Sequence, residues 1–222
     1  MVIAAGWAVL AAVLAGSATA AATGPVLRAL PEPAKAWKKP PYRALATTRF
    51  VLVAGVLAAF TAVLSWYAVP TAALPAWLVI GTCGVLLAMI DARTTWLPLR
   101  LIHAAWLLMA VAVGLGWLLG GGWQLVARAA GGAAVAGSLY FIVWLLTRGG
   151  FGFGDVRFAP LLGAAAAACS WRLLIWALAL GTLVGGVNGL VRLVAKRPGG
   201  FPYAPSMLAG TYLAAVVDWL GG

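Results

Sequence analysis

Acidic residues are nearly absent from this chain of 222 residues, which has four Asp or Glu against 15 Lys or Arg. All charged residues together make up 9% of the sequence, whereas soluble domains carry about a quarter. Hydrophobic residues make up 64%, and the mean hydropathy is +1.03. These values exclude an ordinary soluble domain and predict an integral membrane protein.

Cysteine and histidine are equally scarce, which limits the chemistry open to the chain. The two cysteines, Cys83 and Cys169, lie inside apolar segments and form no Cys-x-x-Cys pattern, so a zinc ribbon is excluded. The single histidine, His103, is interpreted as a core or interfacial residue. The sequence shows no histidine cluster and no Ser–His–Asp set. We therefore expect no metal site and no cofactor.

The apolar runs predict an all-α polytopic membrane bundle, because a helix needs about 20 apolar residues to span a bilayer. Eight candidate spans are found, at 2–23, 50–69, 74–91, 101–119, 124–147, 158–170, 172–194 and 205–220. The sixth span is short and rich in alanine. If it is one arm of a hairpin with the seventh, the number of membrane helices falls to seven. The whole chain, 1–222, is expected to form one domain.

The basic residues fall between these runs, so the net charge of +11 reflects membrane topology and no nucleic-acid partner is expected. With eight spans, 13 of the 15 basic residues lie on one side: Arg28, Lys35, Lys38, Lys39, Arg43, Arg49, Arg93, Arg100, Arg148, Arg157, Arg192, Lys196 and Arg197. The positive-inside rule makes that side cytoplasmic and places both termini outside. A short basic cytoplasmic loop, 24–49, is interpreted as a topology anchor near anionic lipid of the bilayer.

Two of the four acids stand at the edge of apolar runs, where a carboxylate is costly and calls for a reason. Asp91 ends one run and Asp155 precedes another, and both are expected at the cytoplasmic side. Two acids that share a water can cleave an amide, one as general base and the other as general acid. Ion pairs with Arg93 and Arg157 are one alternative explanation. A proton-coupled transporter or channel is another. Glu32 and Asp218 are interpreted as solvated.

The segment Gly150-Phe-Gly-Phe-Gly-Asp155 is not interpreted as a phosphate loop, because no strand precedes it and the Walker lysine is missing. Its glycines instead allow a close approach of the backbone and leave room around the Asp155 carboxylate.

Three segments, in this order, resemble the type IV prepilin peptidases, which are membrane aspartic proteases of the GxGD type. They are Asp91-Ala-Arg93-Thr-Thr-Trp-Leu-Pro98, Gly152-Phe-Gly154-Asp155-Val-Arg157 and Pro202-Tyr-Ala-Pro205-Ser-Met-Leu-Ala-Gly210. The resemblance covers about residues 50–220. It implies that Asp91 and Asp155 are catalytic. It also implies that seven further residues shape the site or bind substrate: Gly152, Gly154, Arg93, Arg157, Pro98, Pro202 and Pro205.

The resemblance further implies a multi-pass protein of the bacterial inner membrane with its active site on the cytoplasmic side. Its substrate would be a prepilin-like membrane protein with a short basic leader, as in type IV and Flp-type (tight-adherence) pilus systems. Arg157 stands where Lys is usual, and Leu99 where a polar residue is common. The first loop lacks the cysteine-rich insert associated with N-methylation in long family members, so no methyltransferase activity is expected. A catalytically dead assembly scaffold is disfavoured, because both acids are intact.

Overall fold

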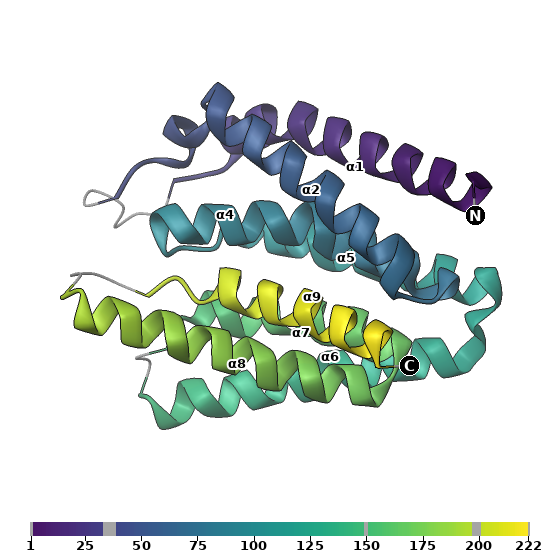
Figure 1. Ribbon diagram of the computed structural model, residues 1–222. Coiled ribbons are helices and arrows are strands. Elements are labelled where there is room, and N and C mark those ends of the chain that lie inside the picture. Colours follow the sequence, from purple (N-terminus) through teal and green to yellow (C-terminus); the bar gives the residue numbers. More distant parts are fainter. Residues whose placement is uncertain (1, 33–38, 149–150, 197–200, 222) are drawn as a thin grey trace.

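The computed structural model describes residues 2–32, 39–148, 151–196 and 201–221. Within these ranges the secondary structure is helical, and no strand is present (Figure 1). The predicted all-α membrane bundle is confirmed. Lys35, Lys38 and Arg197, three of the basic residues assigned to the cytoplasmic side, lie outside the described residues, as does Gly150.

The α-helices are α1 (Val2–Ala29), α2 (Thr48–Ala68), α3 (Leu74–Val79), α4 (Val85–Thr94), α5 (Leu99–Gly116), α6 (Gly122–Leu146), α7 (Phe153–Cys169), α8 (Trp171–Val194) and α9 (Ala204–Leu220). The 3-10 turns η2 (Tyr42–Leu45) and η3 (Thr71–Ala73) precede α2 and α3. The π-helical turns η4 (Ile80–Gly84) and η5 (Trp117–Gly121) follow α3 and α5. The segments η3, α3, η4 and α4 run together without a break.

Apart from the short 3-10 turn η2, the described residues form seven unbroken helical runs, which matches the alternative count of seven helices. The count is seven because the run from Leu99 to Leu146 is continuous. Within it, Leu119 and Gly120 leave helical φ/ψ values, and α5 and α6 fold back on each other at this kink (Figure 1).

Five stretches are long and apolar enough to cross a membrane: Ala5–Ala29, Thr48–Ala68, Thr71–Thr94, Leu99–Leu146 and Trp171–Val194. The protein is therefore a multi-pass membrane protein. The remaining helices, α7 and α9, have 17 residues each. Helix α7 is the most enclosed, and its alanines 164–168 are all buried. Small side chains there let the neighbouring helices approach closely.

Glycines make the closest helix contacts. A Cβ atom on Gly163 of α7 would overlap the Gly132 carbonyl of α6. In the same way, a Cβ on Gly210 of α9 would overlap the backbone of Gly181 on α8. Because lipid gives little hydrophobic drive between helices, such close backbone packing is a main source of cohesion in a membrane bundle.

The chain ends and the two prominent aspartates lie at opposite ends of the bundle. Figure 1 shows both termini toward the right, whereas the C-terminal end of α4 and the N-terminal ends of α7 and α9 lie toward the left. Helix α1 continues past the expected end at residue 23 to Ala29, and Leu27 in this extension is fully buried. The first loop is consequently shorter than expected, and it starts at the same end of the bundle as these aspartates.

Candidate active site

Asp91 lies in the last turn of α4, just before the helix ends abruptly. Thr95, four residues after Asp91, has a φ of 54°, in the left-handed region where β-branched residues are rare. Its N–H group donates to the Asp91 carbonyl at 2.7 Å. The Thr94 hydroxyl accepts a hydrogen bond from the Trp96 N–H at 3.2 Å. The chain therefore turns sharply after Asp91 toward Pro98, the residue that caps α5.

Asp155 lies in the first turn of α7, and two glycines bring it close to the end of α4. A Cβ on Gly154 would lie 3.1 Å from Cβ of Leu97, in the turn that follows Asp91. A Cβ on Gly152 would lie 2.7 Å from Oδ2 of Asp155 itself. The absence of side chains at these two positions thus lets α7 pack against the turn and leaves space for the carboxylate, as the sequence predicts.

Asp91 and Asp155 line one cavity of about 580 Å³. Both are buried, with exposed fractions of 4% and 5%. Glu32 also lines this cavity, so it holds three of the four acidic residues of the chain. The other lining residues are Pro31, Tyr42, Thr95, Trp96, Leu97, Pro98, Leu99, Arg100, Gly152, Phe153, Gly154 and Arg157.

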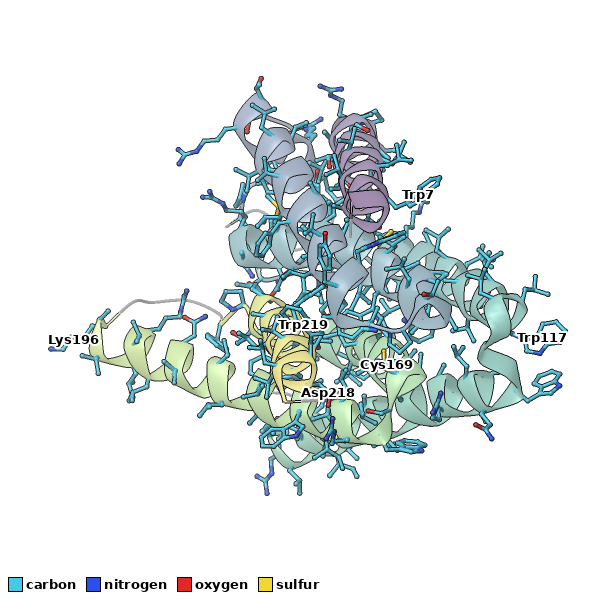
Figure 2. The ribbon with its side chains drawn as sticks, turned by 45° about the vertical axis from the view of Figure 1, so that its right-hand side comes forward. Trp7, Trp117, Cys169, Lys196, Asp218 and Trp219 are labelled. Carbon is cyan, nitrogen blue, oxygen red and sulfur yellow. The ribbon has the colours of Figure 1, made fainter. Side chains whose placement is uncertain are left out.

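The fourth acid lies apart from this cavity. Asp218 of α9 forms an ion pair with Arg172 of α8 at 2.6 Å. From the sequence, Asp218 is interpreted as solvated, whereas the structure gives it this partner. Figure 2 shows Asp218 beside Trp219, far from Lys196, which follows the C-terminal end of α8.

The N-terminus of α9 supplies a hydrogen bond to the site that sequence reasoning missed. The Ala204 N–H donates to Oδ2 of Asp91 at 3.2 Å and also acts on the Asp155 carboxylate. The first N–H groups of a helix have no partner within it and favour anions. The available signal was Pro205, because proline is common in the first turn of a helix.

One buried oxygen of Asp155, Oδ1, lacks a hydrogen-bond partner among the described residues. Among the described residues, no cationic nitrogen lies within 4.0 Å of a carboxylate oxygen of Asp91 or Asp155. The alternative in which each aspartate pairs with the arginine two residues later is therefore not observed.

The structure separates the two arginines that the sequence motifs pair with the aspartates. Arg157 lines the aspartate cavity, and its guanidinium carbon lies 4.6 Å from the centre of the Phe153 ring. Arg93 lines a different cavity, together with Arg49 of α2. Residues two apart on a helix point to different faces, which accounts for Arg93 but not for Arg157, because Arg157 lines the cavity at the same spacing from Asp155.

The three predicted prolines also have different positions. Pro98 lines the aspartate cavity. Pro202 is buried just before α9, whereas Pro205 lines an apolar groove formed by α2, α4 and α9. The prolines near α9 thus position its N-terminus, and among the three only Pro98 is part of the cavity wall.

The first loop contributes residues to the site that the sequence did not predict. The Lys39 ammonium donates a hydrogen bond to Oγ1 of Thr95 and lies 5.0 Å from the centre of the Trp96 ring. The Tyr42 hydroxyl donates to the Trp96 carbonyl at 3.5 Å. Burial, with the negative charges of Glu32 and Asp91, raises the pKa of Tyr42 to about 12. This part of the loop packs onto the turn after Asp91 and is more than a lipid anchor.

The arrangement suits hydrolysis by a pair of acids. In the described residues, no group of three or more His, Cys, Asp or Glu side chains is placed to hold a metal ion. Two carboxylates that face one buried space do not both ionise easily, so they tend to share one proton. One can then act as general base and the other as general acid on a water between them.

Comparison with known families points to a peptidase. The type IV leader peptidase family model matches residues 78–190, a range that includes both Asp91 and Asp155. Comparisons with curated proteins and with solved structures give no match. The family match spans just over half of the chain and contains both buried acids of the cavity. On this basis, the protein is a member of the type IV leader peptidase family.

Proposed function

We propose that this protein is a membrane aspartic endopeptidase that removes the leader peptide of type IV prepilin-like proteins, such as those of Flp-type pili. The observation that carries the proposal is the shared cavity of Asp91 and Asp155 within the family-matched range. The match to a peptidase family also favours an endopeptidase over a proton-coupled transporter.

The two carboxylates supply the acid and the base of the reaction. The ionised one takes a proton from a water molecule, and the water oxygen attacks the carbonyl carbon of the scissile amide. The protonated one donates a hydrogen bond to the carbonyl oxygen, which becomes negative as the C–O bond to water forms. The C–N bond then breaks, and the amine leaves with a proton from the acid. The products are a free carboxylic acid and a free amine.

The position of the cavity supports a substrate that remains in the membrane. The cavity lies at the end of the bundle where α4 ends and α7 begins (Figure 1). The flanking segments carry most of the basic residues, and under the positive-inside rule this supports a cytoplasmic location for this end. There a bond at the membrane surface reaches water while the apolar helix of the substrate stays in lipid.

Glu32 supports a basic leader as the substrate segment. It is exposed and lines the cavity in which the two aspartates are buried. A basic leader would otherwise meet a chain of net charge +11. An exposed carboxylate beside the buried pair gives such a leader a local partner of opposite charge.

Conversion of each aspartate to asparagine tests the proposal. We expect Asp91→Asn and Asp155→Asn each to abolish cleavage of a co-expressed prepilin, while the protein still accumulates in the membrane. Asp218→Asn is the matched control, because Asp218 lies outside the cavity and its partly exposed ion pair contributes about 1 kcal/mol or less. This variant should cleave normally. Substantial cleavage by either cavity variant would overturn the proposed function.

A further inference from the structure

The surroundings of the two cavity carboxylates differ. The Ala204 N–H donates to Oδ2 of Asp91 at 3.2 Å and also acts on Asp155, but the Lys39 ammonium is bound to Thr95, in the turn that directly follows Asp91. Asp155 has a buried oxygen, Oδ1, with no hydrogen-bond partner among the described residues. A buried ionised carboxylate needs hydrogen bonds or a nearby opposite charge, whereas a protonated one tolerates their absence better.

Lys39 is held in position by contacts to the turn that follows Asp91. Its ammonium donates to the Thr95 hydroxyl and lies over the ring of Trp96. Burial lowers the pKa of Lys39, and the negative charge of Asp91 offsets part of that decrease. Because lysine titrates near 10.4 in water and Lys39 is only partly buried, its ammonium remains charged at neutral pH.

The interaction between Lys39 and Asp91 acts through space. No direct ion pair within 4.0 Å joins the two among the described residues. In the low-dielectric surroundings of a buried carboxylate, a unit charge still has an appreciable effect beyond contact distance. Lys39 therefore favours the charged form of Asp91 although it is not among the residues that line the aspartate cavity.

The other charged and titratable groups near Asp91 do not replace Lys39. Those that line the same cavity are Glu32, Tyr42, Arg100, Asp155 and Arg157. Helices α2 and α9 pack against α4, but Arg49 of α2 lines another cavity with Arg93, and α9 contributes the Ala204 N–H. Lys39 differs from these cations because it is bound to the turn that directly follows Asp91, and its charge favours the ionised carboxylate.

We propose that Lys39 is a positioning residue that keeps Asp91 ionised. Asp91 is then the base that takes the proton from water, and Asp155 is the acid that protonates the leaving amine. This assignment rests on the proposed function, which leaves the two roles open. It also gives the first loop a part in the reaction chemistry.

The dependence of cleavage on pH tests this role. The variants are Lys39→Met, which removes the charge, and Lys39→Arg, which keeps it; the matched control is Lys196→Met, which removes an exposed charge outside the cavity. The rate of prepilin cleavage by each purified protein in lipid vesicles is measured from pH 5 to pH 9. In the wild type, the rate falls on the acidic side as the base becomes protonated.

Loss of the cation should move this acidic fall to higher pH. The sign follows because a nearby positive charge favours the ionised carboxylate, so without it Asp91 takes up a proton at a higher pH. We expect Lys39→Met to shift the midpoint by roughly half a pH unit, which is less than the shift of about one to three that an opposite charge in close contact produces. Lys39→Arg and Lys196→Met should keep the wild-type midpoint.

An unchanged midpoint in Lys39→Met, whether the rate is normal or reduced equally at every pH, would overturn the inference. If Lys39→Met does not accumulate, Thr95→Val provides the second test. It removes the hydrogen-bond partner of Lys39 but keeps its charge, and it should move the midpoint in the same direction by a smaller amount. An unchanged midpoint there would also contradict the inference. The proposed function would stand in that case if the Asp91→Asn and Asp155→Asn variants are inactive. Only the role of Lys39 would then be refuted.

Discussion

Cα of Gly152 faces the carboxylate of Asp155, so closely that a methyl group on Gly152 would lie 2.7 Å from Oδ2. Gly154 has a comparable relationship to the turn after Asp91, where its Cβ would lie 3.1 Å from Cβ of Leu97. The first glycine thus leaves room for the acid, and the second lets α7 approach the turn. These contacts give the glycines of the Gly-x-Gly-Asp segment distinct physical roles.

Gly152→Ala should lower the rate of leader cleavage by at least about tenfold, because a displacement of a catalytic group by about 1 Å can cost ~100-fold. The amount of protein in the membrane should stay unchanged. Cleavage by equal amounts of the two purified proteins is the measurement. Gly186→Ala is the matched control, since a Cβ there meets nothing within 4 Å, and it should cleave like the wild type. A normal rate for Gly152→Ala would contradict the close contact.

Gly163→Ala should destabilise the bundle by about 1–3 kcal/mol, because its methyl group would overlap the Gly132 backbone between α6 and α7. Thermal unfolding in detergent, followed by circular dichroism, measures this change. Gly114→Ala in α5 is the control, because its methyl group meets nothing within 4 Å. Alanine also suits a helix interior better than glycine by roughly 0.5–1 kcal/mol. Equal unfolding temperatures for both variants would show that the α6–α7 contact is looser than described.

The distribution of basic residues predicts a topology with both termini outside the cytoplasm. The loops 24–49, 92–100, 148–157 and 195–204 should then face the cytoplasm. Single cysteines at Arg43 and Arg100, in a variant without Cys83 and Cys169, should react with a membrane-impermeant reagent only after the cells are opened. A cysteine at Trp117, at the opposite end of α5, should react in intact spheroplasts (Figure 2). The reverse pattern would place the aspartate cavity on the wrong side for a cytoplasmic leader.

The mature pilin released by this protein should carry an unmethylated N-terminus unless a separate methyltransferase acts. The loop between α1 and α2 has no cysteine to bind zinc, and it is too short to build a core and a pocket for a methyl donor. Mass spectrometry of pilin processed by the purified enzyme with S-adenosylmethionine is the measurement. A pilin methylated by a known methyltransferase serves as the positive control. One added methyl group on the new N-terminal residue would refute the interpretation of the loop.

Two properties were predictable from local sequence. The helical membrane fold follows from composition, because lipid cannot satisfy backbone N–H and C=O groups and so requires helices or closed barrels. Asp91 and Asp155 were identifiable because a carboxylate next to hydrocarbon is costly and stands out in a chain with four acids. The number of helices was left open between eight and seven because the sixth apolar run is short. The count of seven arises elsewhere, in the continuous run that passes through the kink at Leu119 and Gly120.

Only the tertiary structure decided how the site is assembled. Arg157 lines the aspartate cavity while Arg93 lines another, although both stand two residues after an aspartate. Lys39 reaches the turn after Asp91 from a loop far away in the chain, and Ala204 contributes only its backbone N–H. Such contacts depend on how closely small residues let the helices approach. A backbone donor also has no signature in residue type. The sequence by itself therefore determines which groups are available, and the packing of the bundle determines which of them meet.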